Sequence, residues 1–147
     1  MEIKPFNFSK IENVAQLLGN CTPYVLPHHP YIYWIMIEYF QSLCFTAHVD
    51  DKVIGFICAL HSSEKNTVFI WQLAVNDNYR RTGTARLLCE KIIKYTEENN
   101  IRSLQFTISD KNNASISFFS RLAKYYDKSI EEITLDGLGI FENEFCL

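Results

Sequence analysis

The order of strand-like and helical segments in the middle of the chain constrains its fold most strongly. Residues 44–49 and 52–60 are rich in β-branched and aromatic residues, and only two aspartates separate them, which indicates a hairpin. Residues 67–75 form a third such segment, and apolar residues recur at helical spacing over 84–99. A further strand-like segment, 103–109, follows. A hairpin followed by a strand–helix–strand crossover predicts a mixed sheet flanked by helices.

The flanking segments extend this pattern at both ends. Ser9 and Glu12 have the spacing of a capping box, which predicts a helix that begins near Ser9. The other expected elements are a strand at 2–6, helices at 9–18, 31–40 and 113–126, and strands at 130–135 and 139–147. The expected class is α/β (α+β), with a mixed, mostly antiparallel central sheet of about six to seven strands and about four helices.

Size and composition favour one folded domain over residues 1–147, because 48% of the residues are hydrophobic. A net charge of −3 argues against a broadly basic nucleic-acid surface. The first ten residues lack the apolar core of a signal peptide, and no apolar run reaches about 18 residues, so we expect a cytoplasmic protein without membrane contact. The five cysteines include no C-x-x-C pair, which indicates buried reduced thiols and no metal.

The turn between the third strand and the long helix carries the main functional signal. Its sequence, NDNYRRTGTA, places Arg80, Arg81 and Gly83 where the first amides of a helix lack intrahelical partners and the helix dipole adds positive charge. Glycine lets a ligand approach the backbone, and arginine adds bidentate donors. These features predict a pyrophosphate site, although a plain solvated turn is the alternative. Neither a P-loop nor a Rossmann glycine pattern is present.

The R-x-x-G-x-A motif at 80–85 resembles the [QR]-x-x-G-x-[GA] motif of the GCN5-related N-acetyltransferase (GNAT) superfamily. A second block, DKNNASISFF at 110–119, resembles the family's N-x-x-[AS]-x-x-x-[YF] segment, and the order of elements fits along essentially the whole chain. The resemblance implies the GNAT fold, acetyl-CoA as co-substrate and N-acetyltransferase activity. It also implies a set of cofactor-binding residues: Leu73, Val75, Arg80, Arg81, Thr82, Gly83, Thr84, Ala85, Asn112, Ser115 and Phe119.

Within this superfamily, three stretches resemble the diaminobutyrate acetyltransferases of ectoine biosynthesis. They are CTPYVLPHHPYIYWI, VFIWQLAV and DKNNASISFF. The chain departs from that group at 25–27, where an acidic residue is usual, and at Phe141, where histidine is usual. The resemblance therefore implies a small amine acceptor, a diamine or an amino acid such as 2,4-diaminobutyrate, and supports acetyl transfer better than that one acceptor.

Acetyl transfer to an amine requires that the ammonium, with a pKa of about 10.4, first lose a proton. Glu144 and Glu142 are the candidates for binding the amine and accepting that proton, and an exposed charged edge strand is the alternative interpretation. A backbone N–H at Leu73 or Ala74 is the candidate for stabilising the oxyanion. Phe119 stands where many relatives have a tyrosine, so Tyr125, Tyr126 or a water is needed to protonate the leaving thiolate.

Trp71 and Tyr31 are the aromatic residues expected at the acceptor pocket, with a core role as the alternative. His28 and His29 adjoin them and suit a substrate carboxylate, or are simply solvated. Direct attack is expected, because no nucleophile–base pair stands out. The competing functions are a peptide or protein N-acetyltransferase and a non-catalytic acyl-CoA-binding module. The resemblance also implies a homodimer.

Overall fold

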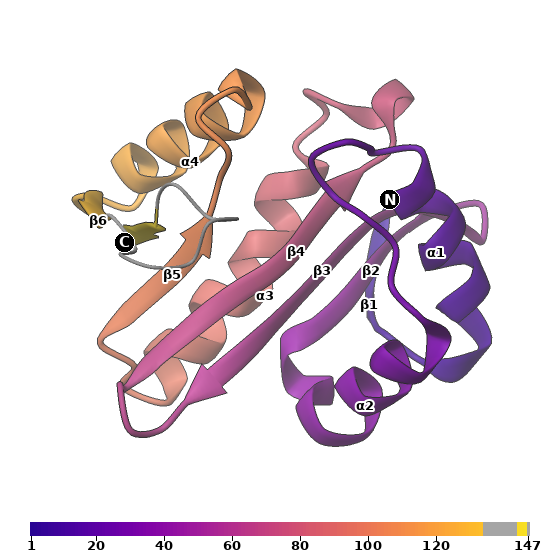
Figure 1. Ribbon diagram of the computed structural model, residues 1–147, viewed down its shortest axis with the longest axis horizontal. Coiled ribbons are helices and arrows are strands. Elements are labelled where there is room, and N and C mark those ends of the chain that lie inside the picture. Colours follow the sequence, from indigo (N-terminus) through magenta and orange to yellow (C-terminus); the bar gives the residue numbers. More distant parts are fainter. Residues whose placement is uncertain (134–143, 147) are drawn as a thin grey trace.

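A computed structural model describes residues 1–133 and 144–146 of the chain (Figure 1). The strands are β1 (Glu2–Pro5), β2 (Cys44–Val49), β3 (Lys52–Ser62), β4 (Thr67–Val75), β5 (Ser103–Thr107), β6 (Glu131–Ile133) and β7 (Glu144–Cys146). The α-helices are α1 (Ile11–Gly19), α2 (Pro30–Phe40), α3 (Thr84–Glu98) and α4 (Asn113–Tyr125). Three short 3₁₀ turns are also present in this part of the chain, η1 (Phe8–Lys10), η2 (Gln41–Leu43) and η3 (Asp77–Tyr79).

The described strands form one sheet in the order β1-β2-β3-β4-β5-β7-β6. Its neighbours are antiparallel except β4 and β5, which are parallel and are joined through α3. The predicted α/β class, with a mixed and mostly antiparallel sheet flanked by helices, is therefore confirmed.

Two apolar clusters pack on the sheet, one on each face. The first joins the sheet to α3 and α4 through buried residues such as Leu88, Ile92 and Phe119. The second joins it to α1 and α2 through residues such as Leu18 and Tyr33. Figure 1 shows α3 behind the strands and the α1–α2 pair at the β1–β3 end of the sheet. This sandwich fixes β4 in the centre, with helices on both of its faces.

The local signals succeeded at the hairpin and failed at the first helix. Asp50 and Asp51 both take positive φ angles, 47° and 63°, as the predicted two-residue turn requires. The capping box at Ser9 is wrong, because the side chain of Asn7 caps η1 by accepting the Ser9 N–H at 3.1 Å. The helix α1 then begins at Ile11, without a side-chain cap.

The remaining boundaries differ from the predicted ones by short distances. The strand β1 ends at Pro5, and β5 ends at Thr107. The two closing strands are present as the three-residue β6 and β7. The rest of the predicted last strand, 139–143, lies outside the described residues.

Candidate cofactor and acceptor site

The strand β4 has an open edge over its last five residues. Its parallel pairing with β5 runs from Thr67–Ser103 to Ile70–Phe106, whereas its pairing with β3 continues to Val75. Between residues 71 and 75, no strand of the described chain covers the side of β4 that faces β5. The two strands diverge there (Figure 1). Unpaired N–H and C=O groups along such an edge suit a ligand that binds as an additional strand.

The hydrogen-bond direction along β4 identifies which groups face the open edge. The Asn76 N–H donates to the Ile54 carbonyl on β3 at 2.8 Å. Successive residues of a strand direct their backbone groups to opposite sides. The groups of Leu73 and Val75 therefore face the open edge, and those of Ala74 face β3. Of the two predicted candidates for the oxyanion donor, Leu73 has its N–H at the open edge, whereas the Ala74 N–H faces β3. The prediction of Ala74 is therefore wrong.

A β-bulge at Trp71 changes which side chains of β4 point to each face of the sheet. Gln72 lies opposite Cys58 and Ile70 lies opposite Ala59, so Trp71 is the extra residue. As a result, Trp71 and Gln72 both pack toward α1 and α2, whereas Ile70 packs in the α3 cluster. Two adjacent side chains of β4 thus reach the same side of the sheet.

The turn after β4 leaves the first amides of α3 without partners. Arg81 and Gly83 have φ angles of 62° and 89°, and Gly83 is the N-cap residue without a side-chain cap. The first bond of the helix runs from the Leu87 N–H to the Gly83 carbonyl at 3.0 Å. In the described part of the chain, the N–H groups of Thr84, Ala85 and Arg86 have no acceptor. The turn predicted to bind an anion therefore has a set of free backbone donors.

The side chains around this turn brace it and supply charge. The Thr82 hydroxyl donates to the Tyr79 carbonyl at 2.6 Å and lies 2.8 Å from the Thr84 hydroxyl, which donates to the Met1 Sδ at 3.1 Å. Both threonine hydroxyls therefore bond within the protein. The Arg80 guanidinium pairs with the Asp77 carboxylate at 2.7 Å, and both side chains are more than half exposed. An exposed pair of this kind contributes little stability and exchanges readily for another anion.

The second predicted block serves α4 itself. The Asn112 Oδ1 accepts the Ser115 N–H at 3.2 Å and so caps the helix. The Phe119 ring is 5% exposed and stacks on Phe106 with centroids 3.8 Å apart. The structure therefore places Asn112 in a capping role and Phe119 in the core.

The acceptor side of the open edge is formed by Trp71 and by the segment that precedes α2. The His28 ring stacks on the Trp71 ring with centroids 4.7 Å apart. Tyr31 is not part of this group, because it is 59% exposed and stacks on Trp34 instead. His29 caps α2, since its Nδ1 accepts the Tyr31 N–H at 3.2 Å. The structure brings Trp71 together with His28, not with the predicted Tyr31.

Sequence reasoning missed four residues that hold the segment 20–29 in place. Buried Tyr33 and Gln72 bond to this segment directly, at His28 and Leu26 respectively. Helical spacing with buried Met36 and Ile37 was the only signal available for Tyr33. The other two residues are Cys21 and Tyr24, which lie within the segment and bond outward from it.

Cys21 and Tyr24 fasten the segment at the two diverging strands. The Cys21 thiol donates to the Val75 carbonyl at 3.9 Å, and burial raises the pKa of this thiol, partly offset by the Arg80 charge. The Tyr24 hydroxyl donates to the Lys111 carbonyl in the β5–α4 loop at 3.2 Å. The segment therefore spans from the end of β4 to the start of α4.

The predicted proton-transfer residues lie in two separate places. The backbone of Glu144 pairs with Thr107 on β5, one residue beyond the last pairing of β4 with β5. Glu142 lies outside the described residues. Tyr125 and Tyr126 lie at the C-terminal end of α4, where the Arg86 guanidinium sits 5.5 Å from the Tyr125 ring centroid. Burial raises the pKa of Tyr126.

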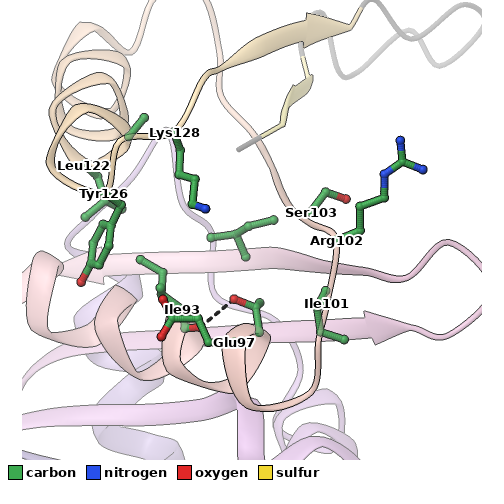
Figure 2. Close-up of a pocket in the computed structure, with 11 residues that line it drawn as sticks. Ile93, Glu97, Ile101, Arg102, Ser103, Leu122, Tyr126 and Lys128 are labelled. Carbon is green, nitrogen blue, oxygen red and sulfur yellow. Dashed lines mark hydrogen bonds between the residues drawn. The ribbon is translucent and has the colours of Figure 1, made fainter.

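Two cavities lined by described residues lie away from the R-x-x-G-x-A turn. One, of about 130 Å³, lies between the ends of α3 and α4, and Figure 2 shows Ile93 and Glu97 of α3 below Tyr126 and Lys128. The other lies between Met1 and the outer side of α3 near Leu87. Neither includes β4. The described residues contain no group of three or more potential metal ligands, and none of their helices is long and apolar enough to cross a membrane.

The comparisons with known proteins agree with this geometry. The model of the "Acetyltransferase (GNAT) family" matches residues 11–124. The L-2,4-diaminobutyric acid acetyltransferase of Halalkalibacterium halodurans is 31% identical over 103 residues, which are 69% of this chain and 54% of that protein. The Halomonas elongata enzyme of the same name is 30% identical over 86% of this chain and 68% of its own length. The matched region thus spans little more than half of the first of these relatives.

Solved structures extend the likeness to the whole fold. The diaminobutyrate acetyltransferase of Paenibacillus lautus, solved with L-2,4-diaminobutyric acid and coenzyme A, has a TM-score of 0.84 and 25% identity. The alignment covers 99% of this chain and 92% of that one. Ard1 of Thermoplasma volcanium, at 21% identity and a TM-score of 0.77, shares the fold. With the family model matching most of its length, this chain belongs to the acetyltransferase (GNAT) family.

Proposed function

We propose that this protein transfers the acetyl group of acetyl-CoA to a primary amine of a small molecule, a diamine or an amino acid such as 2,4-diaminobutyrate. The free amides of Thr84, Ala85 and Arg86 carry this proposal, because they point out of a helix N-terminus beside two arginines. Backbone donors at a helix N-terminus bind pyrophosphate groups well. The complex of the Paenibacillus lautus relative with its substrate and coenzyme A supports the same pair of ligands.

The open edge of β4 accounts for the rest of the co-substrate. Leu73 and Val75 present backbone groups where a pantetheine amide can pair as an additional strand. The turn at 80–85 lies beyond the end of β4, so a molecule with its pyrophosphate on α3 can extend its thioester along the edge toward Trp71. Such an arrangement places the acetyl carbonyl near the Leu73 N–H.

The reaction needs a neutral amine and a stabilised oxyanion. The amine nitrogen attacks the thioester carbonyl, the C–S bond breaks, and the amine proton must leave. Glu144 is the proposed acceptor of this proton, directly or through water, because its backbone pairs with Thr107 where β4 and β5 diverge. The Leu73 N–H is the proposed donor to the oxyanion. A water is the proposed proton donor to the coenzyme A thiolate, because Tyr125 and Tyr126 lie at the far end of α4.

The test is release of free thiol from acetyl-CoA in the presence of single acceptors. The panel contains 2,4-diaminobutyrate, a diamine without a carboxylate, an α-amino acid with one amine, and a peptide. Release with a small amine is the expected result. Release only with the peptide would instead support a peptide N-acetyltransferase. Tight binding of coenzyme A without release would support a non-catalytic acyl-CoA-binding module.

We also propose that the chain forms a homodimer through the outer face of α2. Tyr31, Trp34 and Tyr39 on this face are 59%, 37% and 69% exposed, and their rings contact one another in a row. Exposed aromatic surface of this extent is typical of protein interfaces. Light scattering should give the mass of a dimer for the native chain and of a monomer for Trp34→Glu.

We propose that the protein is located in the cytoplasm. Its support is that Cys21, Cys44, Cys58 and Cys89 are free thiols, as is usual in a reducing compartment. Fractionation of cells that express the tagged chain tests it.

A further inference from the structure

A chain of buried hydrogen bonds connects β4 to the segment before α2. The Gln72 Nε2 donates to the Leu26 carbonyl at 2.7 Å, and its Oε1 lies 3.4 Å from the Tyr33 hydroxyl, which donates to it. The same hydroxyl accepts the His28 N–H at 3.0 Å. Gln72 and Tyr33 are 5% and 0% exposed, so these neutral groups bond to each other and to the segment in place of water.

This network bonds to the backbone of residues 26–28 from the buried side, while the His28 side chain remains exposed. The two backbone bonds, at Leu26 and His28, flank Pro27 and fix the path of the segment. The His28 ring then lies on the Trp71 ring at an interplanar angle of 28°. Because the bulge directs Trp71 and Gln72 to the same face, one strand supplies both the ring under His28 and the anchor for its backbone.

The Tyr33 side chain has two separable roles. Its ring packs edge-to-face on Phe6 and Phe56, with centroids 6.3 and 6.0 Å away, and so belongs to the core. Its hydroxyl serves only the segment and Gln72. A variant that removes the hydroxyl therefore removes the bond that holds the His28 N–H, while the core contacts and the Gln72–Leu26 bond remain.

The ring nitrogens of His28 have no partner among the described residues. This distinguishes His28 from His29, whose Nδ1 caps α2. The free nitrogens lie beside Trp71 at the open edge, on the side away from the arginines of the turn. An imidazole can donate to a carboxylate, and stacking on Trp71 holds its orientation.

We propose that His28 recognises the carboxylate of an amino-acid acceptor, and that Gln72 and Tyr33 are the residues that position it. The proposal rests on the acetyl-transfer function proposed above. It names the acceptor class, a compact amine that carries a carboxylate, and a wall of the acceptor site formed by His28 and Trp71. Amines without a carboxylate gain nothing from His28.

The test compares 2,4-diaminobutyrate with 1,3-diaminopropane, which has the same two amines without the carboxylate. The native protein should prefer 2,4-diaminobutyrate in kcat/KM, and His28→Phe, which keeps an aromatic ring on Trp71, should reduce this preference about tenfold. Tyr33→Phe should raise KM for 2,4-diaminobutyrate several-fold, about three to ten times, with KM for acetyl-CoA unchanged. His29→Ser is the matched control, because serine also caps a helix, and it should leave the preference unchanged.

A binding measurement separates this proposal from the proposed function. The chain has two tryptophans, so Trp34→Phe leaves Trp71 as the sole indole and its fluorescence reports acceptor binding. Thiol release with an unchanged preference in His28→Phe would overturn the role of His28 and leave acetyl transfer standing. A carboxylate preference in binding that His28→Phe removes, without thiol release, would support His28 and overturn acetyl transfer. The absence of any carboxylate preference in the native protein would also overturn the role of His28.

Discussion

Two neighbouring parallel strands lead into helices, and the two turns treat the helix N-terminus in opposite ways. After β5, the Asn112 side chain caps α4 by accepting the Ser115 N–H at 3.2 Å. After β4, Gly83 begins α3 with a left-handed backbone and without any side-chain cap. Both helices carry the same kind of dipole and the same unsatisfied first amides. The cap of α4 satisfies the Ser115 N–H, whereas none of the first three amides of α3 has an acceptor in the described chain.

The difference indicates a trade of stability for binding. A side-chain cap contributes about 1 kcal/mol to a helix, so its absence at α3 forgoes stability that α4 obtains from Asn112. The sequence places two arginines and a glycine at the uncapped turn and an asparagine at the capped one. An anion that binds at α3 would supply the missing acceptors. Under the proposed function, the turn after β4 serves ligand binding and the turn after β5 serves helix stability.

Adding a cap to α3 should give the largest effect. In Gly83→Asp, the new carboxylate competes for the free amides and repels the pyrophosphate, and the left-handed φ of 89° adds strain for any side chain. We expect acetyl-CoA to bind about 100-fold more weakly by calorimetry. Gly19→Asp, at the end of α1, adds the same charge elsewhere and should leave the affinity nearly unchanged. Equal affinities in both variants would show that the α3 amides bind no anion.

Removing the charges beside the free amides should have the next largest effect. Arg80→Ala combined with Arg81→Ala should weaken acetyl-CoA about 20-fold at low salt, because two charge-assisted contacts are lost. The loss should shrink as salt is added. A matched pair of charges, Arg102 and Lys128, lines the cavity between α3 and α4. Replacing that pair by alanine should change the affinity less than about twofold, and a loss equal to that of the arginine pair would mean that only net charge matters.

Local turn chemistry and periodicity made much of this contrast predictable from the sequence. The two-residue hairpin at Asp50 and Asp51, the crossover through α3, and the turn with Gly83 all depend on residues close together in the chain. Glycine at a positive φ and asparagine at a helix start are chemical requirements that a sequence displays directly. The sequence therefore predicted the position of the uncapped turn, where Gly83 takes a positive φ.

The acceptor side depended on packing that local patterns do not show. A two-residue shift on a helix turns a side chain by about 200°, so expecting Tyr31 in place of Tyr33 selected the exposed face of α2. The bulge at Trp71 depends on the register with β3, which the sequence of β4 alone does not contain. Before α1, the Asn7 side chain caps η1 by accepting the Ser9 N–H, and α1 begins at Ile11 without a side-chain cap. The errors at α2 and β4 arose where distant partners decided between equivalent local choices, whereas the error at Ser9 arose from a neighbouring cap residue.

Labelling of Cys21 should report whether coenzyme A occupies the open edge of β4. Its thiol contacts the Val75 carbonyl at the open edge, whereas Cys44, Cys58 and Cys89 are buried. Coenzyme A at ten times its Kd should slow iodoacetamide labelling of Cys21 about tenfold, because only about a tenth of the sites stay free. Mass spectrometry of the Cys21 peptide provides the measurement.

The pH dependence of this labelling follows from the direction of the pKa shift. Burial raises the pKa of Cys21, so its thiolate fraction near neutral pH is below that of a free thiol and increases with pH. Labelling should therefore be slow at pH 7 and accelerate toward pH 9, with protection by coenzyme A at each pH. Labelling that coenzyme A does not slow would place the ligand away from β4.

Removing the cap of α4 should have the smallest effect on binding and a measurable effect on stability. Asn112→Ala leaves the Ser115 N–H without its acceptor, so the free energy of unfolding in urea should fall by about 1 kcal/mol. Asn112→Asp keeps the acceptor and should retain most of that stability. Acetyl-CoA affinity should change less than about twofold in either variant, because the cap already uses the side chain. A large loss of affinity with unchanged stability would instead make Asn112 a cofactor ligand, as the family resemblance implies, and the two turns would then share one role.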